Sequence, residues 1–265
     1  MSASSSPNFW ERIFPHRPGP GRITFDVALP DGSYTYEIRV DVPEGASGPL
    51  PALLYLDANL PSGRPFFQEA GKMMTTGEIP PLLLVGIAQP RKPLTRRNKD
   101  FIPGRKESVF GEGQEPSGAR RFYQFIVHGL LPALQKEFEL SGEYGLAGHS
   151  FGGLFTLYAM YQPERPFSKY LALSPSVWVH RRHLIELAIE LQWEHARPEG
   201  AAYFASGALE KFNLVLDSMK AFSRELKLRE LEGLDFKEEV IPWKNHFTIV
   251  RPGVKRGLEF LYGTR

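Results

Sequence analysis

The beginning of the chain alternates apolar and polar residues with a period of two. The stretch RITFDVALPDGSYTYEIRVDVP (22–43) keeps this alternation on both sides of Asp31-Gly32. Strict alternation is typical of strands with one buried face, and Asp-Gly between two such runs is a strong signal for a tight hairpin. The pattern therefore predicts that the fold begins with two antiparallel strands.

After this hairpin the pattern changes to short apolar runs separated by segments of helical periodicity. The runs predicted as strands are 52–58, 82–88, 143–150, 170–176, 201–207 and 236–242, and the first four are almost uniformly apolar. The segments predicted as helices are 65–77, 118–139, 151–162, 180–195, 211–231 and a last helix beginning near Pro252. Apolar strands that alternate with helices indicate an α/β fold whose mostly parallel central sheet is covered by helices on both faces.

The same pattern defines the domain organisation. Residues 1–21 are rich in Ser, Pro and Gly, which is typical of a flexible N-terminal arm, and no linker or internal repeat divides residues 22–265. We therefore expect a single domain over 22–265. Residues 89–118 lack periodicity and are predicted as one long loop with a basic cluster; loops of about thirty residues are usually functional or disordered.

Composition excludes several classes of protein. The 265 residues include no Cys, which rules out disulfides, zinc–cysteine sites and cysteine nucleophiles. A net charge of +2 is too small to indicate a nucleic-acid partner, and no apolar run is long enough for a membrane span. The first residues lack the features of a secretory signal, so we interpret the chain as cytoplasmic. Neither HExxH nor a P-loop occurs, and we expect no metal and no cofactor.

The candidate chemistry lies in LAGHSFGGLFTLY (146–158), which contains the pattern G-x-S-x-G at Gly148, Ser150 and Gly152. A strand precedes it and a helix follows, which is the context in which this motif presents a nucleophilic serine on a sharp turn. Side chains at 148 and 152 are expected to clash with the chain close by. The N–H of Phe151, at the helix N-terminus, is a candidate oxyanion donor.

A serine nucleophile needs a base and an acid, which follow it along the chain in the order acid, then histidine. His246 lies in the short turn KNH after the strand 236–242, whereas the histidines of 180–195 belong to a charged helical face. Glu210 follows the strand 201–207 and is the candidate acid. Asp217 is the reserve acid, and a Ser–His dyad without an acid is the third alternative. The loop after 52–58 is expected to supply a second oxyanion donor near Ala58 or Asn59, and a plain loop with Asp57 in a turn is the alternative.

Several of these motifs together resemble the putative-esterase family of α/β-hydrolases, most closely its siderophore-esterase branch. The resemblance covers residue 20 to the C-terminus and rests on LLYLDANL, IPPLLLVGIAQP, RRNKDFIP, LAGHSFGGLFTLY, LALSPSVW, SGALE and NHF. It implies an α/β-hydrolase fold with Ser150 as nucleophile, His246 as base and Glu210 as acid. Two departures are Ala58 at a position where the family has Gly, and FIVHGLLP in a helix where it has Glu-Glu-Leu-Ile-Pro.

Three further residues are candidates for contact with substrate. Arg97, in the basic loop, has a guanidinium that can bind an anionic or catecholate ligand in a fork, although a solvated charged loop is the alternative. Trp178, in SPSVW, either lines the pocket or packs at the sheet edge. His149, inside the serine motif, is the third candidate.

These observations predict a serine carboxylic-ester hydrolase that forms an acyl-enzyme on a small-molecule ester, such as a siderophore-type or aryl ester. An acyltransferase that uses the same triad, and a binding protein that has lost the chemistry, are the alternatives. The sequence does not predict an oligomeric state.

Overall fold

The structure is a computed structural model, and it describes residues 21–29, 32, 34–89, 93–104, 118–179, 184–186, 198–212, 214–229 and 231–263. The predicted arm lies outside these residues except for Gly21, which is the first residue of strand β1. Of the predicted helix 180–195, only 184–186 is described.

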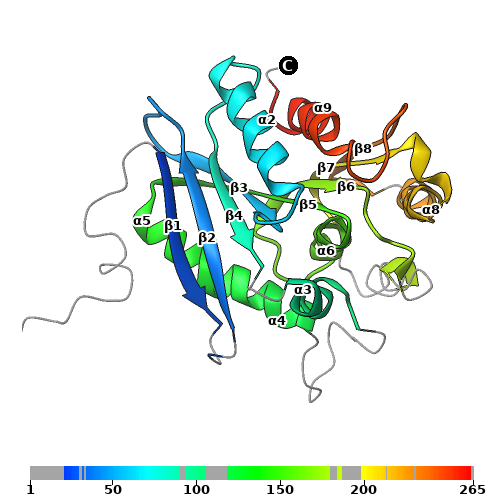
Figure 1. Ribbon diagram of the computed structural model, residues 1–265, viewed down its shortest axis with the longest axis horizontal. Coiled ribbons are helices and arrows are strands. Elements are labelled where there is room, and N and C mark those ends of the chain that lie inside the picture. The colour runs from blue at the N-terminus through cyan, green and yellow to red at the C-terminus, as the bar shows by residue number, and fades with distance from the viewer. Residues whose placement is uncertain are drawn as a thin grey trace, which may run out of the picture.

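The described strands form one eight-stranded sheet in the order β1-β2-β4-β3-β5-β6-β7-β8 (Figure 1). The strands are β1 (Gly21–Ala28), β2 (Thr35–Val42), β3 (Leu50–Leu56), β4 (Leu83–Ala88), β5 (Leu140–His149), β6 (Phe167–Leu173), β7 (Gly200–Gly207) and β8 (Leu234–Ile241). Strand β2 pairs antiparallel with β1 and β4, and all other pairs are parallel. The prediction of a mostly parallel sheet with an N-terminal antiparallel hairpin is confirmed.

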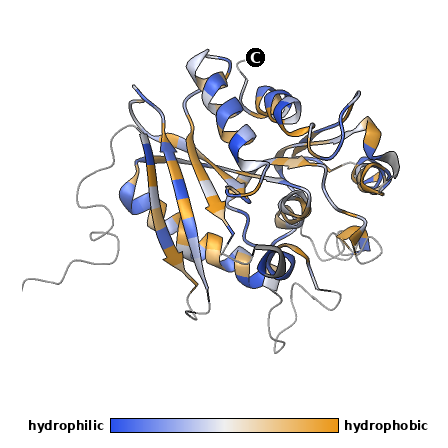
Figure 2. Cartoon of the chain, viewed as in Figure 1, coloured by the Kyte–Doolittle hydropathy of each residue, from blue (hydrophilic) through white to orange (hydrophobic). Residues whose placement is uncertain are grey.

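The hairpin keeps its alternation because only one of its faces is covered. Phe25, Val27, Tyr36, Ile38 and Val40 are buried, and the residues between them on β1 are exposed or half-buried. The two strands accordingly alternate between hydrophobic and hydrophilic colours in Figure 2. The turn closes with the N–H of Leu29 donating to the carbonyl of Tyr34 at 2.8 Å, and Gly32 has the positive φ of 68° that this turn requires.

Helices cover both faces of the parallel part of the sheet, as predicted (Figure 1). The helices are α2 (Gly63–Thr75), α3 (Pro93–Phe101), α4 (Gly118–Gln124), the π-helical segment η1 (Phe125–Leu130), α5 (Leu131–Glu137), α6 (Phe151–Ala159), the 3-10 turn η3 (Ala208–Phe212), α8 (Val215–Leu228) and α9 (Val250–Tyr262). Helices α2 and α9 pack on one face, and α4, α5, α6 and α8 on the other. The departure FIVHGLLP therefore lies at the π-helical segment, where Phe125, Ile126 and Leu130 are buried.

The uniformly apolar strands contribute side chains to both hydrophobic cores. On β3, Leu54 and Leu56 belong to the core beneath α4–α6, and Leu53 and Tyr55 belong to the core beneath α2 and α9. Successive side chains of a strand point to opposite faces. A strand that is buried on both faces is therefore apolar throughout and lacks the alternation of apolar and polar residues. The apolar runs of the sequence are explained by this double burial.

The prediction of one structureless loop over 89–118 is wrong, because residues Pro93–Phe101 form helix α3. Arg96 and Asp100, one turn apart, are both buried and form an ion pair of 2.9 Å. Asp100 also accepts a hydrogen bond of 2.5 Å from the hydroxyl of Tyr36 on β2. Burial raises the pKa of Asp100 to about 6, although Tyr36 and Arg96 counteract the shift. Arg96 and Asp100 are thus buried against each other and Tyr36, whereas Asn98 and Lys99 of the same helix are exposed.

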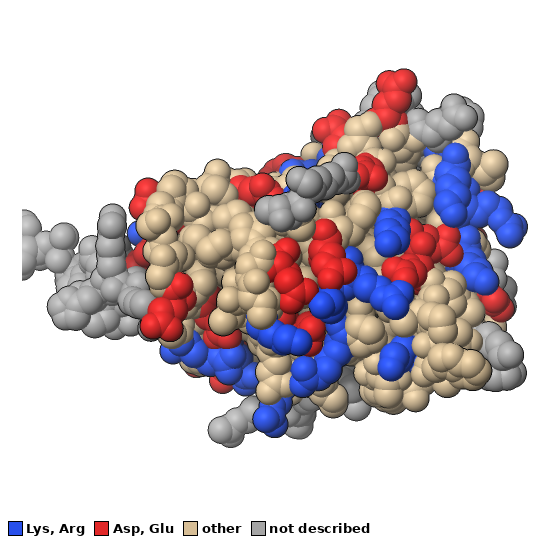
Figure 3. All heavy atoms as spheres, turned by 90° about the horizontal axis from the view of Figure 1, so that it is seen from above, with Lys and Arg blue, Asp and Glu red and all other residues tan. Residues whose placement is uncertain are grey.

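Ion pairs link α9 to α2 and to the turn that follows α2. Lys255 contacts Glu78 at 2.8 Å, and Arg251 contacts Glu69 at 3.6 Å. Seen from above, this face carries basic and acidic side chains interspersed with one another (Figure 3). No helix in the described ranges combines the length and the apolar character needed to cross a bilayer.

Candidate active site

Ser150 lies on the sharp turn between β5 and α6. Its backbone has φ 62° and ψ −117°, a conformation that L-residues rarely adopt. Three backbone hydrogen bonds hold it there: its N–H donates to Leu173 at 2.9 Å, and its carbonyl accepts from Leu154 at 3.0 Å and Ser176 at 3.1 Å. Such a turn, held by both neighbouring elements, presents the serine hydroxyl at the carboxyl edge of the sheet.

The glycines around Ser150 differ from one another. A Cβ at Gly148 would lie 2.3 Å from the backbone of Gly152, so the predicted clash at 148 is confirmed. At Gly152 the closest atom would be the Leu56 Cβ at 3.4 Å, which is ordinary contact, and the predicted clash there is wrong. Gly153 is more crowded, since its Cβ would lie 3.0 Å from the carbonyl of Leu173. The second close approach to neighbouring backbone is therefore made at Gly153, the residue directly after the G-x-S-x-G pattern.

His246 and Glu210 lie together, as the chain order predicted. The Nδ1 of His246 is 2.7 Å from Oε2 of Glu210, a side chain that is 1% exposed. Oε1 of Glu210 accepts hydrogen bonds from the Ser174 hydroxyl at 2.6 Å and the Gly207 N–H at 2.7 Å. Asp217 is exposed in the first turn of α8. The carboxylate beside His246 is therefore Glu210, and the reserve acid is not used here.

The two candidate oxyanion donors in the loop after β3 differ in their hydrogen bonding. The N–H of Ala58 donates to the carbonyl of Ile87 at 3.1 Å, so it is already engaged by strand β4. The side chain of Asn59 makes two bonds to the backbone of Gln89, at 2.8 and 2.9 Å. In the described residues no backbone hydrogen bond uses the N–H of Asn59 or that of Phe151. Of the two predicted positions, Asn59 is the one with an available donor.

Arg97 connects this loop to the serine turn. Its Nε donates to Oδ2 of Asp57 at 2.6 Å, and its Nη2 donates to the carbonyl of His149 at 3.1 Å. Both side chains are buried, and Asp57 has a positive φ of 64°. Burial raises the pKa of Asp57 to about 6, although Arg97 and Gln89 lower it in part. Arg97 therefore joins the loop after β3 to the serine turn, with its guanidinium engaged inside the protein and not solvated as the alternative for this residue had it.

His149 supports the turn that carries His246. Its Nε2 is 2.6 Å from the backbone carbonyl of His246, so it carries the proton and donates it. Burial and the nearby His246 and Arg97 lower the pKa of His149 to about 3. The ring is therefore neutral at physiological pH, and its polar edge is occupied by this contact.

Two serines were missed by the analysis of the sequence. Ser174 donates to Glu210 and has a positive φ of 44°. The Ser176 hydroxyl is 3.5 Å from that of Ser150. Both follow β6 directly, in SPS, where the sequence analysis considered only Trp178. Their position at the carboxyl end of a predicted strand is the signal that could have identified them.

Ser150 and His246 share a cavity of about 280 Å³. Its lining residues are Asp57, Leu60, Pro61, Ser62, Arg97, His149, Ser150, His246, Phe247 and Val250. Arg97 and His149 thus border the cavity as predicted, whereas Trp178 is 38% exposed and does not line it. Phe247, which sequence reasoning missed, does.

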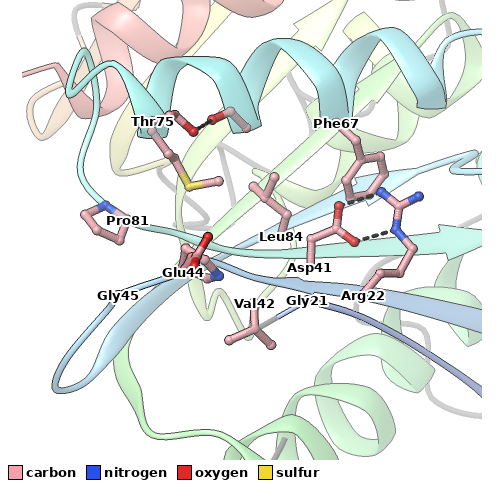
Figure 4. A pocket seen from close by; sticks show the side chains of 13 residues that line it. Gly21, Arg22, Asp41, Val42, Glu44, Gly45, Phe67, Thr75, Pro81 and Leu84 are labelled. Atoms are coloured by element: carbon pink, nitrogen blue, oxygen red, sulfur yellow. Dashed lines mark hydrogen bonds and ion pairs between the residues drawn. The ribbon is translucent and has the colours of Figure 1, made fainter. Parts of the chain in front are cut away.

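A larger cavity of about 670 Å³ lies away from Ser150, between the β1–β2 hairpin and α2 (Figure 4). Its walls include Val42, Phe67 and Leu84, with an ion pair between Arg22 and Asp41 at 2.6 Å. Ligands of α/β sheets bind at the carboxyl ends of the strands, which is the edge with Ser150 and His246. Among the described residues, no group of three or more His, Asp or Glu side chains is placed to hold a metal ion.

The chain matches a known family and several characterised proteins. Residues 21–221 match the model of the family described as "Putative esterase". The ferri-bacillibactin esterase BesA of Bacillus subtilis is 25% identical over 247 residues, covering 85% of this chain and 84% of that protein. The siderophore triacetylfusarinine C esterase of Aspergillus fumigatus is 33% identical over 141 residues, covering 49% of this chain and 46% of that protein.

Solved structures share the fold. The BES protein from Bacillus cereus superposes with a TM-score of 0.78 at 23% identity, covering 93% of this chain and 98% of that one. The enterobactin and salmochelin hydrolase IroE gives a TM-score of 0.66 at 19% identity, covering 92% of this chain and 95% of that one. With the family match over most of its length, the chain belongs to the putative esterase family of α/β-hydrolases, resembles its siderophore-esterase branch, and is a carboxylic ester hydrolase.

Proposed function

We propose that the chain hydrolyses esters through a Ser150–His246–Glu210 triad and an acyl-enzyme intermediate. The observation that carries this proposal is the 2.7 Å contact between the buried Glu210 and His246, which lines the same cavity as Ser150. A serine hydroxyl becomes a useful nucleophile only with such an oriented base. The strained turn at Ser150 supports the same role.

Acylation begins when Ser150 Oγ attacks the ester carbonyl and His246 Nε2 takes the hydroxyl proton. Glu210 holds the proton on Nδ1, which leaves Nε2 as the acceptor, and its negative charge stabilises the imidazolium that forms. The imidazolium then gives its proton to the departing alcohol as the ester C–O bond breaks. Ser174 and Gly207 keep the carboxylate in place, because they donate to its other oxygen.

The oxyanion of each tetrahedral intermediate is bound by the N–H groups of Phe151 and Asn59. Both belong to segments held by Arg97, whose bonds to Asp57 and to the His149 carbonyl join the loop after β3 to the serine turn. Donors that are fixed before the reaction cost no reorganisation when charge develops. Deacylation repeats the steps with water in place of the alcohol, and His246 takes the proton of that water.

In the described residues no hydrogen bond joins Ser150 to His246, and the Ser150 hydroxyl faces Ser176 at 3.5 Å. Catalytic hydrogen bonds often tighten only when substrate is bound. A rotation of the Ser150 side chain from Ser176 toward His246 is therefore part of the proposed cycle.

For the substrate we propose a siderophore-type ester. The support is the likeness to BesA over most of both chains and to the triacetylfusarinine C esterase over about half of this chain. A hydrolysis panel tests the proposal: a catecholate trilactone, a feruloyl ester, an acetylated sugar and a short p-nitrophenyl ester. Preference for the trilactone is expected, and indifference to it would refute this substrate class.

The mechanism is tested with Ser150→Ala against Ser141→Ala. Ser141 is exposed at the opposite end of the same strand β5, so its variant controls for a serine lost from this strand. We expect Ser150→Ala to lower kcat for p-nitrophenyl acetate by at least ~10⁴-fold, because loss of a triad nucleophile leaves only oxyanion and binding effects. Unchanged hydrolysis by Ser150→Ala would show that the nucleophile lies elsewhere.

A further inference from the structure

The loop after β3 begins with a tight turn. The N–H of Leu60 donates to the carbonyl of Asp57 at 2.9 Å, which closes a β-turn, and both residues line the same cavity as Ser150. The peptide at the centre of this turn joins Ala58 to Asn59, so the carbonyl of Ala58 and the N–H of Asn59 form one planar unit. This N–H is the candidate oxyanion donor, and the orientation of the peptide decides whether it faces the cavity.

The closing hydrogen bond leaves the orientation of the central peptide open. Types I and II of the β-turn share this bond and differ by a half-rotation of the central peptide. Type II needs a positive φ at the second central position, which Asn tolerates better than most residues. Neither Ala58 nor Asn59 has a positive φ, so the turn is not of type II. Since Asn59 permits the rotated form, contacts outside the turn are needed to favour the observed one.

Arg39 of β2 is the side chain that contacts the peptide itself. The N–H of Ala58 is bonded to Ile87. The side chain of Asn59 is bonded to Gln89, and neither interaction uses the Ala58 carbonyl. Nη1 of Arg39 donates to this carbonyl at 3.2 Å, and within the described residues no other side chain does so. The C=O and N–H of a trans peptide point in opposite directions, so this bond directs the N–H of Asn59 away from β2.

The surroundings of Arg39 and of the Ala58 carbonyl fit this arrangement. Nε of Arg39 donates to Oε1 of Glu37, two residues back on the same face of β2, at 2.6 Å. Gly86 of β4 pairs with Arg39, and a Cβ there would lie 2.6 Å from the Cβ of Ala58. A Cβ at Gly63 would lie 2.2 Å from the Ala58 oxygen. The absence of both side chains therefore lets the loop and its carbonyl approach Arg39.

We propose that Arg39 is a positioning residue, which keeps the N–H of Asn59 turned toward the oxyanion of the proposed reaction. This inference rests on the proposed function, in which that N–H is the second donor. The charged guanidinium also draws electron density from the peptide and strengthens its N–H as a donor. Without Arg39, the rotated turn would bring the Ala58 oxygen to the place of the N–H, where it repels the negative charge.

The test compares Arg39→Met with Arg22→Met. Both arginines border one cavity of about 350 Å³, which Ala58 also lines. The guanidinium of Arg22 donates to Asp41 and, among the described residues, to no atom of the turn (Figure 4). Arg22→Met therefore controls for the loss of a cation from this part of the surface.

Arg39→Met is expected to lower kcat for p-nitrophenyl acetate by roughly 10- to 100-fold and to leave KM within about twofold of the wild type. Loss of an oxyanion donor costs about 10²–10³ in kcat, and a rotating peptide still offers the donor part of the time. Phenylboronic acid forms a tetrahedral anion on a serine nucleophile, so its inhibition constant should rise by the same factor. Arg22→Met should change neither quantity. Arg39→Lys keeps the charge and a donor, and it should lose less with the same parallel.

Three results would overturn the inference while leaving the proposed function intact: wild-type kcat and boronate affinity in Arg39→Met, an equal loss in Arg22→Met, or a loss of kcat without a matching loss of boronate affinity. A purely structural role would give the third result, and Arg39→Lys reports it even where Arg39→Met does not fold. Hydrolysis by Ser150→Ala would instead refute the proposed function. The two failures are therefore distinguishable.

Discussion

Two groups of side chains lie in the segments around Ser150 and His246. In the first group, Asp57, Arg97, His149 and Glu210 are all nearly buried, and each is hydrogen-bonded to a neighbouring segment. In the second group, Trp243 and Phe247 are 84% and 71% exposed. The first group positions the serine turn, the base and the oxyanion loop relative to one another. The second group contributes little to folding and is available to a ligand.

This difference separates the chemistry from the choice of substrate. Buried polar groups are costly unless they are paired, so changes among them affect stability and turnover together. Exposed rings carry no such penalty, so changes among them should leave the chemical step unaffected. The two groups should therefore respond differently to substitution, and the following predictions run from the largest expected effect to the smallest.

Glu210→Gln should lower kcat by about 10³- to 10⁴-fold. The amide would present an N–H to His246 Nδ1 and favour the wrong tautomer, as occurs when the triad acid is replaced by its amide elsewhere. Asp217→Asn, seven residues on and exposed in α8, is the matched control and should keep its kcat. Equal activity of the two variants in steady-state assays would remove Glu210 from the triad.

Arg97→Met should destabilise the fold by about 3–5 kcal/mol, because it leaves Asp57 charged and unpaired in the interior. The loss should be larger at pH 8 than at pH 5, since the pKa of Asp57 is already raised to about 6 and its neutral form tolerates burial. Urea unfolding measures both effects. Asp57→Asn combined with Arg97→Met should cost less than the sum of the single variants, and strict additivity would contradict a coupled pair.

His149→Gln should make the protein less sensitive to acid. The pKa of His149 is lowered to about 3 in the folded state from an unfolded value of 6.5, so the unfolded chain binds the extra proton below pH 6.5. This group therefore contributes stability above pH 6.5 that is lost as the pH falls toward 3, by about 1.4 kcal/mol per pH unit. Urea unfolding between pH 7 and 4 should show a shallower decline in the variant, and parallel curves would refute the assignment.

Trp243→Gly should raise the stability by about 1 kcal/mol, or about 2–4 °C in Tm, because glycine adopts the φ of 59° without strain. Trp243→Ala is the matched control, since it keeps a Cβ and with it the strain. Thermal unfolding followed by circular dichroism compares the two variants. A lower Tm for Trp243→Gly would mean that the ring stabilises the fold and is not held for a ligand.

The sheet and most helices were predictable because their signal is local. The hairpin showed a period of two around Asp31-Gly32, and strands such as β3 and β4 showed apolar runs. Helix α3 was not predicted, because Arg96 and Asp100 gave it a polar pattern typical of solvent exposure. Their burial depends on Tyr36 of β2, a partner about sixty residues away that no local pattern reveals.

The candidate site was likewise predictable from the sequence only in part. Ser150, His246 and Glu210 could be selected by chain order and by their position after predicted strands, and the structure brings His246 and Glu210 into contact. The choice between Ala58 and Asn59 required the pairing of Ala58 with Ile87, which is a tertiary contact. The engagement of Arg97 by Asp57 is likewise a contact across forty residues of chain. Residue types and order thus predict the reacting groups, and the groups that position them emerge only from the fold.

The most direct test of the account is to trap the acyl-enzyme. Intact mass spectrometry of the folded protein after exposure to a fluorophosphonate should show a single adduct, and peptide mapping should locate it on Ser150. Ser150→Ala should give no adduct, and Ser141→Ala should label as the wild type does. Absence of an adduct on the wild-type protein, or an adduct on another residue, would contradict the proposal that Ser150 is the nucleophile.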